Sequence, residues 1–190
     1  SLRLLIRKLA DSVMQPTAIK RLQDILQGDG TKITRDTIGS YLDYLHESYL
    51  TFGISSFTDS VSQRESIKKR YFYDNGILNL FLFLPETKLL ENLVAIKLYN
   101  KYGDDLYYYN KNVEVDFCVP NDGLLIQASY RIIDEATRNR EIGALQKLSK
   151  FIKPQRCIIV TYDQEEIIQS NDLDVQIEVI PAYKFMLMAL

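Results

Sequence analysis

The most constraining stretch of the sequence is an alternating run at residues 113–117, which is followed after a turn by residues 125–130. The first run alternates apolar and acidic residues, which is typical of a strand with one polar face. The Asn-Asp-Gly turn at 121–123 suits a hairpin because glycine accepts a positive φ and Asn and Asp bond to their own backbone. Three polar residues lie on these two strands, which otherwise favour burial: Asp116, Gln127 and Ser129.

The first third of the chain has the spacing of three short helices. Apolar residues at helical intervals predict a helix over residues 2–14, and Pro16 ends it because proline disfavours helix at the residue before it. Thr17 is expected to cap a second helix, which ends at residues 28–30. Thr34 is expected to cap a third helix, which supplies apolar residues to the core as far as residue 50.

Two strands are expected next, at residues 52–57 and 70–73, with a polar loop over residues 58–69. Three short helices followed by a two-stranded hairpin form a winged-helix pattern, in which the third helix is the recognition helix. We therefore expect a winged-helix domain over residues 1–85.

Five basic residues are the candidates for contacts with nucleic acid: Arg35, Arg64, Lys68, Lys69 and Arg70. Acidic residues on the third helix offset Arg35, so base reading is disfavoured there, whereas the wing is richer in positive charge. A few Lys and Arg side chains give salt-sensitive binding to phosphates but no choice of sequence. The alternative is that this domain packs against or binds a protein partner, and both alternatives remain open.

The second domain is expected over residues 86–190 and begins with a helix that ends near Lys101. Glu91, Val94 and Leu98 share one face of this helix. A carboxylate on an apolar face is costly to bury unless it is paired or bound to a metal, which makes Glu91 a candidate site residue. The alternative is that Glu91 lies near the helix N-terminus, where the helix dipole favours an acid.

The remaining segments complete an α+β domain with a central mixed sheet flanked by helices. A tyrosine-rich strand at 105–109 precedes the hairpin, and a long helix follows it from Asp134 to Pro154. Arg138, Arg140 and Glu141 on that helix are expected on its solvated face. A strongly apolar strand at residues 157–162, an alternating strand at 175–179 and a terminal helix from Pro181 end the chain.

The order of these elements resembles the metal-dependent nuclease core written PD-(D/E)XK. In that core a helix glutamate, a strand aspartate and an acid two residues before a lysine bind a divalent ion. The resemblance assigns the first two positions to Glu91 and Asp116, which implies a weak Mg²⁺ site on these carboxylates. Gln127 and Ser129 replace the acid and the lysine. The resemblance therefore implies a degenerate site without the positive charge that stabilises a phosphoryl transition state.

Four motifs carry a more specific resemblance: YLDYLHESYL at 41–50, KRYFYDNG at 69–76, LLENLV at 89–94 and EVDF at 114–117. In this order they resemble the C-terminal region of a large prokaryotic family of AAA-type ATPases. In that family a P-loop ATPase module precedes a winged helix and a PD-(D/E)XK-like domain of uncharacterised function. The resemblance implies that ATP and Mg²⁺ belong to the N-terminal module, since this sequence has no Gly-x-x-x-x-Gly-Lys-Ser/Thr motif.

Three functions follow from these observations. The first is a non-catalytic interaction module that acts beside its own ATPase module and binds DNA or a protein partner. The second is a metal-dependent nuclease domain with an altered site. The third is a structural or oligomerisation domain that regulates the ATPase.

The composition bears on the possible partners and on the cellular compartment. The net charge is −2, so no strong global field attracts nucleic acid. Residues 1–85 carry 11 basic and 9 acidic side chains, a net of +2, whereas residues 86–190 carry 12 and 16, a net of −4. The two cysteines suit a reducing cytosol, and no apolar run reaches the roughly 18 residues that span a bilayer. We expect a cytoplasmic protein without a membrane partner, and the single histidine, His46, excludes a histidine-based triad.

Overall fold

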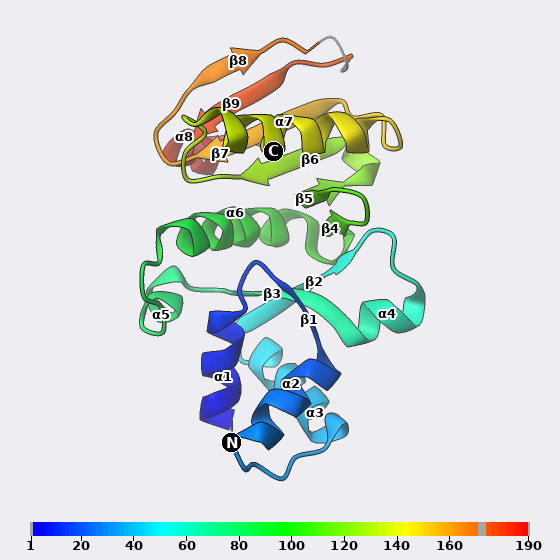
Figure 1. Ribbon diagram of the computed structural model, residues 1–190, viewed down its shortest axis with the longest axis vertical. Coiled ribbons are helices and arrows are strands. Elements are labelled where there is room, and N and C mark those ends of the chain that lie inside the picture. Colours follow the sequence, from blue (N-terminus) through cyan, green and yellow to red (C-terminus); the bar gives the residue numbers. More distant parts are fainter. Residues whose placement is uncertain (1, 171–173, 190) are drawn as a thin grey trace. The chain divides into compact units, whose positions relative to one another are not determined.

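Figure 1 shows the protein as a computed structural model, which describes residues 2–170 and 174–189. Two compact units divide the chain, Ser1–Asn92 and Leu93–Leu190. The architecture is α+β, and the second unit contains a mixed sheet with helices against it, as the sequence predicts. Among the helices of the described residues, none combines the length and the apolar character needed to cross a membrane.

The first unit packs three helices beside a small antiparallel sheet (Figure 1). The helices are α1 (Leu2–Asp11), α2 (Ile19–Gly28) and α3 (Arg35–Glu47). The strands are β1 (Pro16–Ala18), β2 (Thr51–Ser56) and β3 (Ile67–Phe72), in the order β1-β3-β2, so β3 is the central strand. Two short helices, α4 (Val61–Ser66) and α5 (Asn75–Asn79), flank β3 along the chain.

Local capping explains where the helices of this unit begin. The Thr34 side chain accepts a hydrogen bond from the Thr37 amide at 3.2 Å, which confirms its predicted role as the cap of α3. Thr17 was expected to cap the second helix, and this is wrong. It lies in β1, opposite Lys68 of β3, and α2 begins two residues later. Residues 16–18 pair with β3 as an edge strand, so α2 begins only after them.

The segment expected as a loop at 58–69 is also different. It forms α4 and the first residues of β3, so β3 begins at Ile67 rather than at residue 70. The Gln63 side chain accepts a hydrogen bond from the Ser60 amide at 3.0 Å, which is half of a capping box. The sequence pattern does not predict this helix, because α4 is short, is composed mostly of polar residues and buries none of them.

The helix α6 (Glu86–Tyr102) contributes its first turns to the first unit. The buried side chain of Asn92 accepts a hydrogen bond from the Phe72 amide at 2.8 Å and donates one to the Phe72 carbonyl at 2.9 Å. It also donates to the Asn75 side chain at 2.8 Å. The division of the chain therefore falls after Asn92, seven residues beyond the boundary expected at residue 85.

The second unit contains six strands in the order β4-β5-β6-β7-β9-β8. They are β4 (Tyr107–Asn110), β5 (Glu114–Val119), β6 (Leu124–Ala128), β7 (Arg156–Thr161), β8 (Glu166–Ile168) and β9 (Ile177–Pro181). The strands β6, β7 and β9 are parallel and the other pairs are antiparallel, which makes the sheet mixed. The short strand β8 was not expected.

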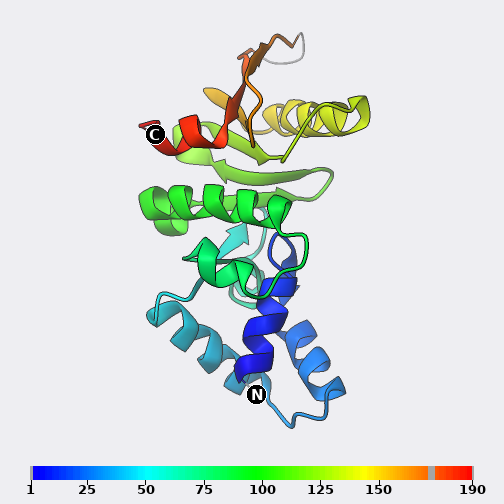
Figure 2. The same ribbon diagram turned by 90° about the vertical axis from the view of Figure 1, so that its left-hand side faces the viewer.

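Two helices cover this sheet, and Figure 2 shows them on opposite faces. The helix α7 (Glu135–Ser149) contacts β5 and β6, and α8 (Ala182–Leu187) contacts β7 and β9. The predicted hairpin between β5 and β6 is confirmed. Its Gly123 has a φ of +57°, and a Cβ there would lie 2.8 Å from the Gln155 amide nitrogen, so the turn requires glycine.

We predict that Asn92→Asp destabilises the first unit by about 3 kcal/mol, because a carboxylate cannot donate to the Phe72 carbonyl and two acceptors would face each other in a buried place. Urea unfolding followed by circular dichroism measures the change. The exposed Asn79→Asp on α5 is the matched control and is expected to leave the midpoint almost unchanged. Equal midpoints for the two variants would contradict the prediction.

Candidate functional site

The candidate site of the second unit lies where β5 and β6 stop pairing. The regular ladder ends with the pair Phe117 and Ile126. Beyond that pair, side chains replace the backbone ladder. The Gln127 side-chain oxygen accepts a hydrogen bond from the Asp116 amide at 2.8 Å, and its amide nitrogen donates to the Glu114 carbonyl at 3.1 Å. In return, the Asp116 carboxylate accepts a hydrogen bond from the Ala128 amide at 3.0 Å.

These hydrogen bonds give Asp116 and Gln127 a structural role in joining β5 to β6. The structure brings Asp116 and Gln127 together, as the sequence predicts, but each side chain bonds to the backbone of the other strand. Gln127 is buried and uses both ends of its amide. A glutamate in its place could accept the Asp116 hydrogen bond but could not donate to the Glu114 carbonyl. The amide at this position is therefore explained by strand pairing.

Ser129 also has a structural partner. Its hydroxyl donates to the Arg131 carbonyl at 3.2 Å, and its backbone amide donates to the Val160 carbonyl at 3.0 Å. The residue is buried beyond the end of β6. It occupies the position that the nuclease pattern gives to lysine, and it supplies no positive charge there.

Glu91, the fourth predicted site residue, belongs to the first unit. Its carboxylate accepts a hydrogen bond from the Tyr71 hydroxyl at 2.7 Å and lies 3.7 Å from the Lys69 ammonium nitrogen. Glu91 is 1% exposed and Lys69 is 0% exposed. A buried carboxylate needs a compensating charge or hydrogen bonds, and here β3 supplies both. Within residues 2–170 and 174–189, no three His, Cys, Asp or Glu side chains form a group that could hold a metal ion.

Glu141 is the residue that the sequence analysis misplaced. It was expected on a solvated face, yet it is buried on α7 with Ala144, Leu145 and Leu148. Its spacing of three, four and seven residues to these apolar residues is the signal that identifies it as inward-facing. The Arg140 guanidinium, which is largely exposed, lies 2.6 Å from the Glu141 carboxylate and donates two hydrogen bonds to it.

The surroundings of Glu141 raise its pKa above the ordinary value. Burial is the largest cause, and repulsion from Asp116 and Glu114 acts in the same direction, whereas Arg140 acts against them. Asp116, Glu114, Glu141 and Arg140 therefore form one electrostatic cluster between β5 and α7, which we call the β5–α7 cluster. Asp134 also acts on Arg140, so this guanidinium stands among several carboxylates.

The two cysteines do not extend this cluster. Cys118 and Cys157 are buried on β5 and β7, and burial raises the pKa of each thiol to about 12. A thiol with so high a pKa supplies little thiolate at neutral pH, so neither residue is suited to nucleophilic chemistry.

The five predicted nucleic-acid contacts divide into two groups. Lys69 and Arg70 are buried because they lie on the central strand β3, and the Arg70 guanidinium donates to the Thr17 carbonyl at 3.0 Å. They do not lie on an exposed wing. Arg64 and Lys68 are half-buried, and Arg35 is exposed.

Two of the remaining three basic residues also have partners within the fold. The Arg64 guanidinium donates to the carbonyls of Phe57 and Asp59, both at 3.1 Å, and so orders the turn before α4. The Arg35 guanidinium donates to the Gln23 side chain at 3.3 Å. Four of the five predicted contacts are thus bonded within the fold of this unit.

We predict that Gln127→Glu destabilises the second unit by about 2 kcal/mol, because the Glu114 carbonyl loses its donor and faces a carboxylate instead. Chemical denaturation measures the effect. Gln169→Glu, at an exposed position after β8, makes the same chemical change without a buried partner and is expected to be neutral. A neutral result at both positions would show that the amide exchange contributes nothing to stability.

We predict opposite pH dependences for two glutamate variants. The folded-state pKa of Glu141 is raised, so its stabilising contribution is present at acidic pH and is lost as the pH rises. Glu141→Gln is therefore expected to be more stable than the parent at neutral pH, with the difference vanishing below about pH 4.

Glu178 provides the control of opposite sign. Two hydrogen bonds from Arg156 lower its pKa, so its contribution is present at neutral pH and is lost on acidification. Glu178→Gln should be less stable at neutral pH and converge with the parent in acid. Unfolding free energies measured from pH 3 to 8 would refute the assignment if both variants shifted in the same direction.

Comparisons with known proteins cover this chain unevenly. Residues 1–88 match a family described as a domain of unknown function, DUF8612. The uncharacterized protein MJ1544 of Methanocaldococcus jannaschii is 34% identical over 181 residues. That match covers 90% of this chain and 40% of the relative, so the chain spans less than half of that protein's length. No solved structure matches this chain.

Proposed function

We propose that this chain is a non-catalytic interaction module of an AAA-type ATPase and that it binds a protein partner. ATP and Mg²⁺ belong to the ATPase module in this proposal. The chain's own part is recognition, through a winged-helix unit joined to a degenerate PD-(D/E)XK unit.

The topology of the first unit supports the winged-helix part of the proposal. Helix α1, strand β1, helices α2 and α3, strand β2, the short helix α4 and strand β3 follow one another, and β1 pairs with β3 on the side opposite β2. This arrangement suits a compact recognition unit in which a helix pair stands beside a small sheet.

Contacts between two of the sequence motifs support the ATPase resemblance. The KRYFYDNG motif at 69–76 and the LLENLV motif at 89–94 bond to each other through Glu91 and Asn92. Two motifs that form one buried hydrogen-bonded group are expected to occur together. Their joint occurrence in this sequence is thus explained by the hydrogen bonds between them, and it supports a resemblance in local structure to the corresponding region of the ATPase family.

A single observation carries the non-catalytic assignment: both ends of the Gln127 amide bond to the β5 backbone. A nuclease of this type needs that position to offer an anionic oxygen to a hard cation. Here the Gln127 side chain is neutral, and both ends of its amide are already bonded. Ser129 replaces the lysine, and the Glu91 carboxylate bonds to Tyr71. We therefore place the nuclease alternative second to interaction.

The burial of positive charge favours a protein partner over DNA. Counterion release by Lys and Arg at phosphates supplies most non-specific DNA affinity, and it requires side chains that reach the phosphates. Lys69 and Arg70 are buried and Arg64 bonds to carbonyls. Few of the predicted contacts are left for a polyanion.

One surface feature keeps DNA as the second candidate for the partner of this chain. A cleft of about 400 Å³ lies between the beginnings of α2 and α3 and the start of β3, and Lys20 and Arg35 line it. Asp36 lines it as well, and Lys20 pairs with Asp24, which reduces the net positive charge. One or two cationic groups, Lys20 and Arg35, could bind a DNA phosphate in this cleft. Such a site predicts weak DNA binding with a shallow salt dependence.

We predict no cleavage of plasmid DNA in Mg²⁺ or Mn²⁺, and duplex binding no tighter than about 10⁻⁵ M at low ionic strength. Gel electrophoresis and fluorescence anisotropy measure the two activities. Cleavage by the parent that Asp116→Ala abolishes would overturn the non-catalytic assignment. Tight binding that Arg35→Glu abolishes would move DNA ahead of protein. A reading frame without a P-loop ATPase segment beside this chain would remove the ATPase context.

A further inference from the structure

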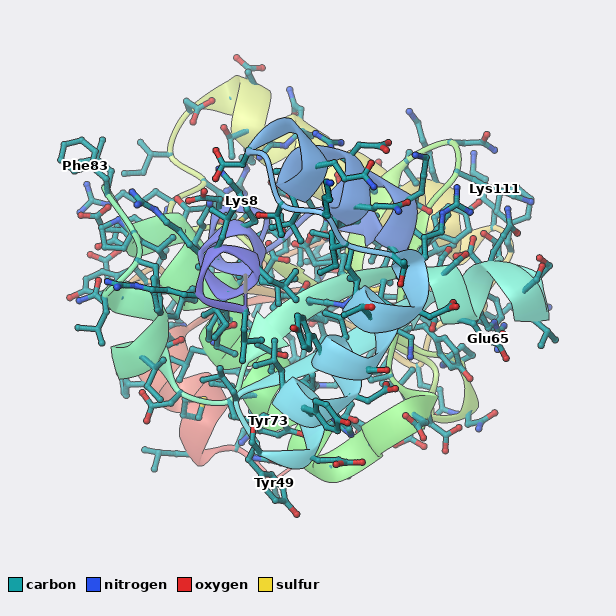
Figure 3. All side chains as sticks on the ribbon, turned by 90° about the horizontal axis from the view of Figure 1, so that it is seen from below. Lys8, Tyr49, Glu65, Tyr73, Phe83 and Lys111 are labelled. Atoms are coloured by element: carbon teal, nitrogen blue, oxygen red, sulfur yellow. The ribbon has the colours of Figure 1, made fainter. Side chains whose placement is uncertain are left out.

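The segment between α5 and α6 exposes an unusual amount of apolar surface. Leu80 is 80% exposed, Phe83 93% and Leu84 76%. Figure 3 shows the Phe83 side chain extending away from the ribbon at the edge of the molecule. Single exposed apolar residues are ordinary, but three within five residues concentrate apolar surface on one short segment, and such concentrations are typical of interaction surfaces.

This patch adjoins a hollow of about 490 Å³. Three residues of α1 and two of the exposed segment line it: Arg3, Leu4, Arg7, Leu80 and Phe81. A volume of this size accepts one or two large side chains of a ligand. We call the hollow and the three exposed residues beside it the α1–α5 surface.

Two arginines give this surface its charge. Arg3 and Arg7 are four residues apart on α1, so they lie on one face about 6 Å apart along the helix axis. Both are exposed, and within the described part of the chain neither forms a hydrogen bond or an ion pair. The nearby Lys8 pairs with the Asp11 carboxylate at 3.6 Å, and the Lys88 ammonium donates to the Asp11 carbonyl at 2.5 Å.

The backbone of Leu84 gives a further indication. It has a φ of +55°, a left-handed conformation that bulky residues rarely adopt and that costs about 1–3 kcal/mol. Burial of the side chain would normally offset such a cost, yet Leu84 is largely exposed. Leu84 thus combines a left-handed backbone with an exposed side chain, as Tyr49 does, and here it stands next to Phe83 in the exposed apolar segment.

We infer that the α1–α5 surface binds an acidic amphipathic segment of a partner protein, an inference that rests on the proposed interaction role. An apolar side chain of the partner enters the hollow against Leu4 and Phe81. Two carboxylates of the partner, three or four residues apart on a helix, meet Arg3 and Arg7 as charge-assisted pairs. Leu80, Phe83 and Leu84 cover the apolar face of the segment.

Other kinds of partner fit this surface less well. Electrostatic attachment to anionic lipid uses clusters of about four to eight basic residues, and two unpaired guanidinium groups fall short of that. Duplex DNA requires many phosphate contacts, and two guanidinium groups supply few of them. A hollow lined by apolar side chains and two guanidinium groups is the complement of a helix with an apolar face beside an acidic one.

The test uses this chain and a synthetic helical peptide of about 16 residues, with Leu and Phe on one face and two Glu residues four apart beside them. Fluorescence anisotropy measures its affinity. We expect binding in the micromolar range, weakened about tenfold or more by the double variant Arg3→Glu with Arg7→Glu, and similarly by Phe83→Ser with Leu80→Ser. All four side chains are exposed, so circular dichroism and thermal unfolding should match the parent.

Two controls separate the assigned surface from general attraction. Arg21→Glu on α2 changes the net charge by the same amount per residue, and Val61→Ser on α4 removes an apolar side chain that is 79% exposed; both should bind as the parent does. A peptide with Lys in place of Glu should bind the doubly reversed variant and not the parent.

Several outcomes would overturn the inference. These are no binding at about 1 mM peptide, equal binding of the acidic and basic peptides, or equal loss with Arg21→Glu. Tighter binding of phosphatidylserine vesicles or of single-stranded DNA, lost in the same variants, would assign the surface to lipid or nucleic acid instead. Failure here with no plasmid cleavage leaves the proposed function standing elsewhere on the chain, whereas cleavage that depends on Asp116 removes the proposed function itself.

Discussion

Side-chain amides that complete the backbone hydrogen bonding of a strand are the interactions on which both units depend. A buried backbone N–H or C=O group must find a partner, and a primary amide offers a donor and an acceptor at the spacing of a peptide group. Asn92 does this for Phe72 at the end of β3, and Gln127 does it for Glu114 and Asp116 on β5. Neither task can be performed by the corresponding carboxylate, which has no donor.

This constraint bears directly on function. In the second unit, Gln127, to which the nuclease resemblance would assign an acid, joins two strands through a neutral amide. In the first unit, the helix glutamate bonds to Tyr71 and lies beside Lys69, so its burial is compensated by groups of β3. Groups that could have served chemistry are instead part of the hydrogen-bonded framework, which is why recognition is the function we propose.

The distribution of charge separates structural from available side chains. Lys69, Arg70 and Arg64 are used inside the first unit, whereas Arg3 and Arg7 stand on α1 beside exposed apolar residues. Side chains bonded inside the fold are not available to a ligand, whereas unpaired guanidinium groups on the surface can select an acidic ligand. Apolar surface and unpaired charge coincide on the α1–α5 surface, and this is where we infer that a partner binds.

Local patterns in the sequence determined much of the fold. The helical spacing, the Thr34 cap, the Gly123 turn and the apolar alternation of β5 predict their elements correctly because each depends on residues close together in the chain. The same spacing places Glu91 on an inward face. Only the tertiary structure decided what compensates it, because Lys69 and Tyr71 lie on a distant strand. The edge pairing of β1 and the two backbone partners of Gln127 were decided in the same way, since hydrogen-bond partners depend on which strands become neighbours.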